Sequence, residues 1–204
     1  MRRTKEDAAI TRKQLLEKAL LVFSQKGYTA TTLQDIAAAA QVTRGAIYWH
    51  FGGKAELYNT LIREYADRGN SIMQEAVAEG GTLLDILRRV FVRQLQAIER
   101  DPEMRALMEL VSFKTGPVPE LAAGRQQQIE AGLSLIEMLS GIMAQGVEAG
   151  LLRSDIAAPD LARAYLAYQN GLIQLWLTAP EQFSLQDRAA TFAEVLLTGI
   201  QAQP

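Results

Sequence analysis

The stretch from Leu33 to Phe51, LQDIAAAAQVTRGAIYWHF, constrains the fold most, because its length suits two short helices joined by a turn. Thr32 and Thr43 each precede one predicted helix, where a hydroxyl accepts a hydrogen bond from a free amide of the first turn. The apolar contacts between the helices are expected from Ile36, Ala37, Ala40, Val42 and Ile47. This pattern predicts a helix-turn-helix, with two helices that cross closely at a steep angle.

The second of these helices is rich in side chains that suit nucleic acid. Arg44 and His50 can donate hydrogen bonds to phosphate or guanine, and Tyr48 and Trp49 can donate to phosphate or stack. Gly45 allows a close approach of the backbone. We therefore expect this helix to contact DNA; the alternative is a packed three-helix bundle with an ordinary surface.

Charge is divided unevenly along the chain, although the formal net charge is only -2. Residues 1–68 contain 11 Lys and Arg against 7 Asp and Glu, which leaves +4, and the rest of the chain carries -6. A basic N-terminal third is expected where only that part meets phosphate. Arg2, Arg3 and Lys5 form either a basic arm or a solvated terminus.

The phrase TTLQDIAAAAQVTRGAIYWHF, followed by GGKAEL, resembles the DNA-binding signature of the tetracycline-repressor (TetR/AcrR) family. The segment RRTKEDAAITRKQLLEKALLVFSQKGYTATTL is similar to the first helix of that family, particularly in members that repress multidrug efflux pumps. The later two thirds resemble the family only in length, helicity and the phrase YLAYQNGLIQLWL. The resemblance implies that the following positions face DNA: Thr32, Thr43, Arg44, Gly45, Tyr48, Trp49, His50 and Lys54. Many members have glycine where this chain has Gln41, and a left-handed non-glycine residue there costs about 1 kcal/mol.

Helical spacing and glycine breaks divide the chain further. Apolar residues recur at helical spacing from Asp7 to Lys26, and Gly27 is placed to end that first helix. Gly52 and Gly53 follow the helix-turn-helix, and a long helix is expected after them. The predicted parts are a DNA-binding domain over 1–53, a connecting helix over 54–78 and a ligand-binding and dimerisation domain over 79–204.

The C-terminal domain is also predicted to be helical. Its helices are expected over about 83–100, 102–115, 119–149, 158–178 and 184–199. No stretch alternates with period two, so we expect no strands and an all-α fold.

The stretch from Asp160 to Thr178 has two apolar faces, so one face is expected inside the subunit and the other against a neighbouring copy. The last helix offers a matching seam, and a pair of such seams makes the four-helix contact that is usual in the family the chain resembles. The predicted dimer residues are Tyr168, Leu172, Trp176, Phe192 and Leu196. A monomeric core is the alternative.

Polar residues in apolar surroundings indicate a ligand site. Gln169 and Asn170 lie beside Leu166 and Ile173, and a buried amide without a partner costs a few kcal/mol. These amides therefore form hydrogen bonds with each other, with the backbone, with water or with a ligand, or they are exposed at the dimer interface. The resemblance implies a cavity for flat, hydrophobic compounds. The predicted ligand residues are Met108, Ser112, Leu135, Leu139, Leu166, Gln169, Asn170 and Ile173.

Other classes of protein have little support. The chain has no cysteine and one histidine, so thiolate metal sites are excluded and no metal, cofactor or enzymatic activity is expected. It has neither the apolar region of a signal peptide nor a run long enough to span a membrane, which predicts a cytoplasmic protein.

Together these observations predict an all-helical homodimer that represses transcription and leaves a (pseudo)palindromic DNA operator when a small hydrophobic or aromatic ligand binds. Two other classes remain. One is a constitutive or architectural DNA-binding protein without a ligand, and the other is a helical module that docks a protein.

Overall fold

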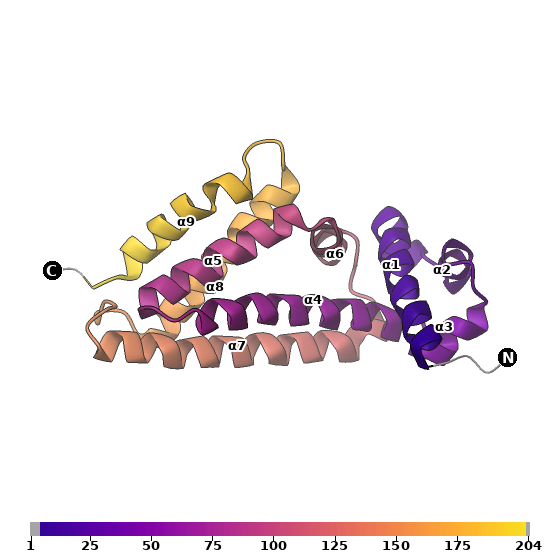
Figure 1. The fold of residues 1–204 in the computed structure, drawn as a ribbon, viewed down its shortest axis with the longest axis horizontal. Helices are drawn as coiled ribbons and strands as arrows, with labels where there is room; N and C mark the ends of the chain where they lie inside the picture. Colours follow the sequence, from indigo (N-terminus) through magenta and orange to yellow (C-terminus); the bar gives the residue numbers. More distant parts are fainter. Residues whose placement is uncertain (1–4, 203–204) are drawn as a thin grey trace. The chain divides into compact units, whose positions relative to one another are not determined.

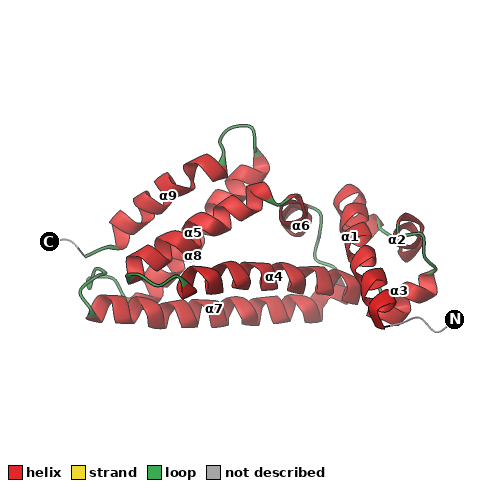
Figure 2. Cartoon of the chain, viewed as in Figure 1, coloured by secondary structure: helices red, strands yellow, loops and turns green. Residues whose placement is uncertain are grey.

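The computed structural model describes residues 5–202, and this part of the chain is helical apart from its loops and an isolated antiparallel bridge between Leu152 and Gln201 (Figure 1 and Figure 2). The elements are α1 (Lys5–Ala30), α2 (Leu33–Ala39), α3 (Arg44–Phe51), α4 (Lys54–Ala78), α5 (Leu83–Arg100), α6 (Pro102–Phe113), the 3-10 helix η1 (Pro119–Leu121), α7 (Ala122–Glu148), α8 (Ala158–Thr178) and α9 (Leu185–Ile200). The expected all-α class is confirmed. None of these described helices is long and apolar enough to cross a bilayer. Arg2 and Arg3 of the predicted basic arm lie outside the described residues.

The chain divides into two compact units that do not follow the order of the sequence. The first unit contains Met1–Asp67 and Glu103–Gly124, and the second contains Arg68–Pro102 and Arg125–Pro204. The boundary therefore falls inside α4 and α7. The sequence had placed residues 79–204 in one domain, whereas the structure groups α6 with the first unit. The physical reason is that Leu107 and Leu110 of α6 are buried in the core that α1 helps to form.

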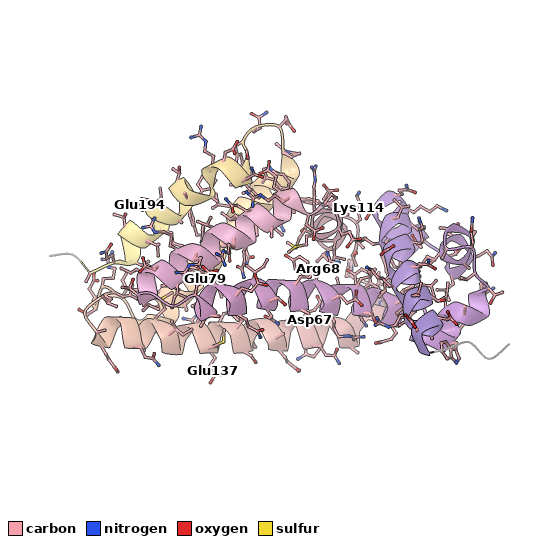
Figure 3. The ribbon with its side chains drawn as sticks, viewed as in Figure 1. Asp67, Arg68, Glu79, Lys114, Glu137 and Glu194 are labelled. Atoms are coloured by element: carbon pink, nitrogen blue, oxygen red, sulfur yellow. The ribbon has the colours of Figure 1, made fainter. Side chains whose placement is uncertain are left out.

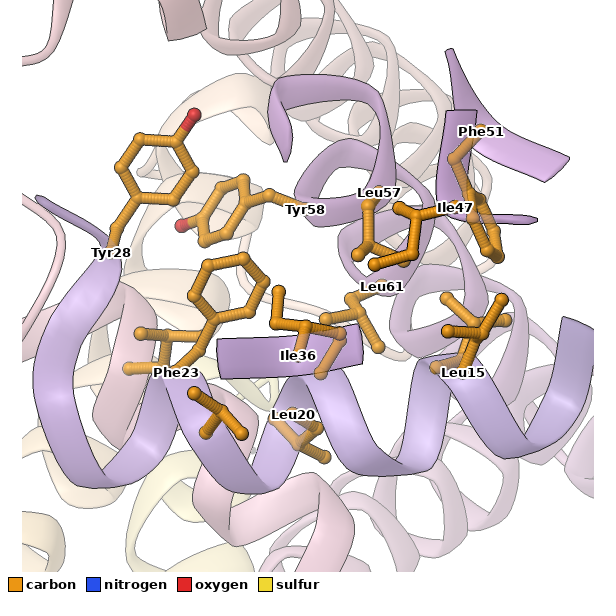
Figure 4. Close-up of a cluster of buried hydrophobic side chains, with 14 of the residues drawn as sticks. Leu15, Leu20, Phe23, Tyr28, Ile36, Ile47, Phe51, Leu57, Tyr58 and Leu61 are labelled. Carbon is orange, nitrogen blue, oxygen red and sulfur yellow. The ribbon is translucent and has the colours of Figure 1, made fainter. Parts of the chain in front are cut away.

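The core of the first unit joins α1, α2, α3 and α4 around a group of aromatic rings (Figure 4). The ring of Phe23 stacks on Tyr28 at 5.6 Å, and Tyr58 meets both edge-on at 5.9 and 5.0 Å. The aliphatic side chains around the rings include Leu15, Leu20, Ile36, Ile47, Leu57 and Leu61. Because these residues recur every three or four positions, each helix turns one face to this core.

The core of the second unit is formed by α5, α8 and α9. Phe91 of α5 lies edge-on to Tyr165 at 5.6 Å and stacks on Tyr168 at 5.9 Å. The Tyr165 hydroxyl donates to the Leu87 carbonyl at 2.8 Å, which satisfies a buried polar group. Trp176 is 2% exposed and is among the largest fully buried side chains.

Charged side chains of α5 form ion pairs within the second unit, and Figure 3 labels two of their partners, Glu79 and Glu194. Arg93 forms a bidentate ion pair with Glu79, with N–O distances of 2.7 and 3.0 Å. Arg88 forms an ion pair with Glu194 of α9 at 2.5 Å. Glu99 accepts a hydrogen bond from the Gln186 amide at 2.6 Å and so caps the start of α9. The contacts of Arg88 with Glu194 and of Glu99 with Gln186 connect α5 to α9.

Gly27 and Gln41, two positions that the sequence marked as turns, are among the residues with positive φ. Gly27 has φ 75°, and its left-handed conformation interrupts the helical dihedral angles of α1 near the predicted stop. Gln41 has φ 55° and occupies the turn between α2 and α3. The left-handed turn considered from the sequence is therefore present, with a side chain where glycine suits it better.

Candidate nucleic-acid interface

The start of α2 is held by a reciprocal pair of side chains. Thr32 is the N-cap, its hydroxyl accepts from the Asp35 amide at 3.1 Å, and the Asp35 carboxylate accepts from the Thr32 amide at 2.9 Å. Lys26 Nζ lies 2.7 Å from Asp35 Oδ1, and this contact, together with those from Thr32, holds the pKa of the Asp35 carboxyl well below its usual range. Thr32 thus has a structural role as a cap, as its position predicted.

The start and end of α3 are also capped. The Thr43 hydroxyl accepts from the Ala46 amide at 3.3 Å, and Gly52, with φ 75°, ends the helix in the left-handed conformation. Between α2 and α3, the Val42 amide donates to the Ala37 carbonyl at 3.0 Å and closes the turn. Ile47 is fully buried and fixes the inner face of α3.

The outer face of α3 carries the predicted DNA contacts. Arg44 and Gly45 are exposed, Tyr48 is 49% exposed and Trp49 is 73% exposed. A large aromatic side chain so open to solvent on a short helix that is capped at both ends is available to contact a partner. His50 is half-buried and lies edge-on to Trp49, with ring centroids 4.4 Å apart.

Lys54 lies in a different environment from the exposed residues of α3. Its side chain is only 20% exposed, and its ammonium group donates to the carbonyls of Tyr28 and Thr31 at 3.2 and 3.1 Å. It also lies 4.4 Å from the centre of the Tyr28 ring and 3.8 Å from Glu120 Oε1. The sequence predicted a phosphate contact here and did not predict these internal partners.

The predicted ligand residues fall in both units. Met108 and Ser112 are half-buried on α6 of the first unit. In the second unit Leu139, Gln169 and Ile173 are buried, Leu166 is half-buried and Leu135 is 38% exposed.

Asn170 requires a correction, because it is exposed on α8. Its neighbour Gln169 is 5% exposed, and the Gln169 Nε2 atom is buried without a hydrogen-bond partner among the described residues. Neighbouring positions on a helix point about 100° apart, so only one of the two amides reaches the core. The argument from a buried amide therefore applies to Gln169 and fails for Asn170.

Three of the five predicted dimer residues are covered by their own subunit, and the other two stay a prediction. Leu172, Trp176 and Leu196 are 8%, 2% and 8% exposed, so they are part of the core of their own subunit. Tyr168 and Phe192 are half-buried against aromatic rings of the same chain. The other apolar face that the sequence indicated on α8 is also largely covered within the subunit, since Ile173 and Leu177 are 6% and 7% exposed.

Two partners in this region were missed by the sequence interpretation. Asp35 completes the cap of α2, and a sequence signal existed, since it stands three residues after Thr32. Glu120 accepts a hydrogen bond from the Tyr28 hydroxyl at 2.9 Å across 92 positions of the chain. No local pattern marks a pair so far apart in sequence.

Comparison with known proteins agrees with this geometry. Residues 15–61 match the profile of "Bacterial regulatory proteins, tetR family", and residues 83–201 match that of "MAATS-type transcriptional repressor, C-terminal region". The HTH-type transcriptional regulator AcrR of Shigella flexneri is 33% identical over 96% of this chain and 92% of its own length. The chain belongs to the TetR family.

Members of the TetR family are DNA-binding transcriptional regulators, and this chain has their helix-turn-helix. The crystal structure of NalD, the secondary repressor of the MexAB-OprM multidrug efflux pump in Pseudomonas aeruginosa, superposes with a TM-score of 0.86. It is 26% identical and the match covers 97% of this chain and 98% of NalD. The SmeT-triclosan complex shares the fold with a TM-score of 0.81, at 22% identity, over 95% of this chain and 93% of SmeT. The expected family is thereby confirmed.

Proposed function

We propose that this TetR-family regulator is a homodimeric repressor that leaves its operator when a small hydrophobic ligand binds. The observation that carries the proposal is the capped α3, which presents Arg44, Tyr48 and Trp49 to solvent. These side chains offer hydrogen-bond donors and aromatic surfaces for phosphate and for the base edges of the major groove. Since NalD is named as the repressor of an efflux pump, we place a transporter operon among the regulated genes.

The dimer we propose uses the face of α8 that the subunit leaves exposed. Ala164, Ala167 and Gly171 recur on this face at helical spacing, and Leu175 on the same face is 64% exposed. Small residues let two helices approach closely, and an apolar side chain so exposed gains most from a partner. Val195 of α9, 60% exposed, adds a second apolar contact.

The ligand we propose is neutral or weakly charged and largely apolar. The buried residues of α8 are Leu161, Ala162, Tyr165, Gln169, Leu172, Ile173, Trp176 and Leu177, and none of them is charged. Gln169 Nε2 is a buried hydrogen-bond donor with no partner among the residues that the structure describes, and such a donor suits an acceptor oxygen or nitrogen of a ligand. SmeT, which shares the fold, has been solved in complex with triclosan.

Selection of DNA by the purified protein tests the first part of this proposal. A random duplex library is enriched over several rounds, and the selected duplex is footprinted. We expect two inverted half-sites whose centres are roughly 34 to 36 Å apart, or a multiple of that distance, since a two-fold dimer reads successive grooves. A library without enrichment would contradict DNA binding and favour the protein-docking module.

Mass spectrometry of small molecules released from the denatured protein tests the ligand. We expect an apolar, neutral compound that dissociates the selected duplex when it is added back. A small, highly charged metabolite would contradict the proposed site. Operator binding that no compound alters would favour a constitutive regulator.

A further inference from the structure

Three side chains of the first unit, Tyr28, Lys54 and Glu120, form a polar cluster that we call the latch. The Tyr28 hydroxyl donates to Glu120 Oε1 at 2.9 Å, and Lys54 Nζ lies 3.8 Å from the same oxygen. Lys54 also covers the Tyr28 ring at 4.4 Å. Burial and the neighbouring Glu120 raise the pKa of Tyr28, so its hydroxyl stays protonated and remains a donor.

The latch is one part of a wider attachment of segment 114–121 to the end of α1. The Lys114 ammonium donates to the Ser24 carbonyl at 2.7 Å, and the Tyr28 amide donates to the Lys114 carbonyl at 3.1 Å. Leu121, at the end of the segment, is 3% exposed within the core of this unit. The segment is therefore held by backbone, charged and apolar contacts together.

Gly27 shows how closely this segment approaches α1. A Cβ atom on Gly27 would lie 3.1 Å from the Lys114 carbonyl oxygen, and its φ of 75° disfavours any side chain. The turn from 27 to 31 is therefore shaped to receive segment 114–121.

The latch lies where two long helices begin. Lys54 is the first residue of α4, and Glu120 stands two residues before α7. Both helices continue from the first unit into the second, so the chain leads from the latch into the second unit along both of them. On the other side, the Thr31 carbonyl that Lys54 holds directly precedes Thr32, the N-cap of α2.

We propose that the latch positions the helix-turn-helix: segment 114–121 holds Lys54, and Lys54 holds the turn from Tyr28 to Thr31, which directly precedes Thr32, the N-cap of α2. This proposal describes how DNA binding by the proposed repressor is controlled, so it rests on the proposed function. Tyr28, Lys54 and Glu120 are positioning residues, and Lys54 acts by holding this turn rather than by binding phosphate. When segment 114–121 shifts, the turn loosens and fewer molecules hold α2 and α3 ready for DNA.

Fluorine NMR tests the latch without DNA, because the chain has two tryptophans in different places. Trp49 is exposed on α3 and Trp176 is buried on α8, so fluorotryptophan gives one signal for each unit. In Tyr28→Phe and Glu120→Ala we expect the Trp49 signal to shift or broaden, while the Trp176 signal stays unchanged. Glu120→Gln keeps an acceptor for Tyr28 and is expected to restore much of the Trp49 signal.

Glu17→Ala is the matched control for the loss of a carboxylate. Glu17 pairs with Lys13 on the surface of α1 at 3.9 Å and has no part in the latch. Both signals should stay at their wild-type positions in this variant. A wild-type Trp49 signal in both Tyr28→Phe and Glu120→Ala would overturn the proposal.

Affinity for the selected duplex separates positioning by Lys54 from phosphate binding. We expect Tyr28→Phe and Lys54→Met each to weaken binding about 3- to 10-fold, since Tyr28→Phe removes the hydrogen bond to Glu120 and Lys54→Met removes those to the Tyr28 and Thr31 carbonyls. The double variant, Lys54→Met with Glu120→Ala, should bind the duplex no more weakly than the single variant Lys54→Met. The reason is that the two residues act through the same series of contacts. The salt dependence of Lys54→Met should match wild type, whereas loss of a phosphate contact lowers its slope by about one.

The role assigned to Lys54 would be overturned if the losses of DNA affinity added up in the double variant and the salt dependence of Lys54→Met had a lower slope than that of wild type. If no duplex is selected, the proposed function fails, and the fluorine spectra still decide whether the latch positions α3. The two failures are therefore distinguishable.

Discussion

At the scale of single residues, position on a helix decides what a side chain can do. Trp49 and Trp176 are the two tryptophans of the chain, yet one is 73% exposed and the other 2%. The short α3 buries Ile47 and Phe51 on one face, so Trp49 points away from the core. Trp176 belongs to the buried stripe of α8. The exposed tryptophan is available to a partner, and the buried one stabilises the fold.

The first prediction concerns Arg44 and Tyr48, which lie on the open face of α3. Replacing either with Ala should weaken binding to the selected duplex by about 1 to 3 kcal/mol, because each loses contacts to bases or phosphate. Thermal stability should stay at the wild-type value, since neither side chain is buried. The control is Arg63→Ala, which removes one exposed charge from α4. Wild-type affinity in both α3 variants would refute the assignment.

The second prediction uses the neighbours Gln169 and Asn170, one buried and one exposed. Gln169→Leu should raise the stability of the unliganded protein by about 1 kcal/mol, because it removes a buried donor for which the described residues offer no partner. The same change should weaken ligand binding by about 1 to 3 kcal/mol in calorimetry with the compound identified by mass spectrometry. Asn170→Leu is the control and should change stability by less than about 0.5 kcal/mol. Equal effects of the two changes on ligand binding would contradict the proposal that Gln169 donates a hydrogen bond to the ligand.

At the scale of elements, local signals predicted most helix ends. Thr32, Thr43 and Thr82 each cap the helix predicted to follow them, because a cap and its amide partner lie within three residues. The long helix expected over 54–78 has those bounds in the structure.

Contacts between distant parts of the chain could not be predicted from local sequence signals. The pair of Tyr28 and Glu120 is separated by 92 positions, and no spacing rule connects them. Periodicity showed two apolar faces on α8 but carried no information about which neighbour covers each, so the burial of Trp176 within its own subunit was not predicted. Local chemistry thus predicted the capped reading helices, while the interior of the second unit needed the structure.

The turn between α2 and α3 gives the third prediction. Gln41 has φ 55°, and a side chain in this conformation is strained by its own backbone. Gln41→Gly should therefore raise the free energy of unfolding by about 0.5 to 1 kcal/mol, measured by urea denaturation. Gln34→Gly, a change of the same type inside α2, should lower it by a similar amount. A destabilised Gln41→Gly variant would show that the side chain has a role beyond the turn.

The fourth prediction concerns the cap of α2 in acid. Lys26 and Thr32 lower the pKa of Asp35 in the folded protein below the ordinary value of 3.8 for this side chain. The stability that this carboxylate contributes is therefore present above about pH 4 and is lost as the pH falls further, because the unfolded state binds the proton more readily. In Asp35→Asn this part of the decline should be absent, and unfolding followed between pH 5 and pH 2 measures the difference. An identical decline in both proteins would contradict the role of Asp35.

At the scale of the whole molecule, the two units share the work of a regulator. The first unit carries the exposed α3, and the second carries the exposed face of α8 that we propose for the dimer. A single helix-turn-helix binds DNA weakly, so two linked copies gain affinity because the second binds at a high effective concentration. Assembly and DNA binding are therefore expected to fail together.

The last prediction tests this connection with two leucines of similar exposure. Leu175 on α8 is 64% exposed and Leu133 on α7 is 61% exposed, so neither change to Glu should disturb the subunit core. Leu175→Glu places like charges at the proposed two-fold contact, and we expect monomers by sedimentation at micromolar concentration. Affinity for the selected duplex should fall about 100-fold or more, because each half-site then binds alone. Leu133→Glu should remain dimeric and bind DNA as wild type does. A dimeric Leu175→Glu variant, or a monomeric wild type, would refute an α8 interface.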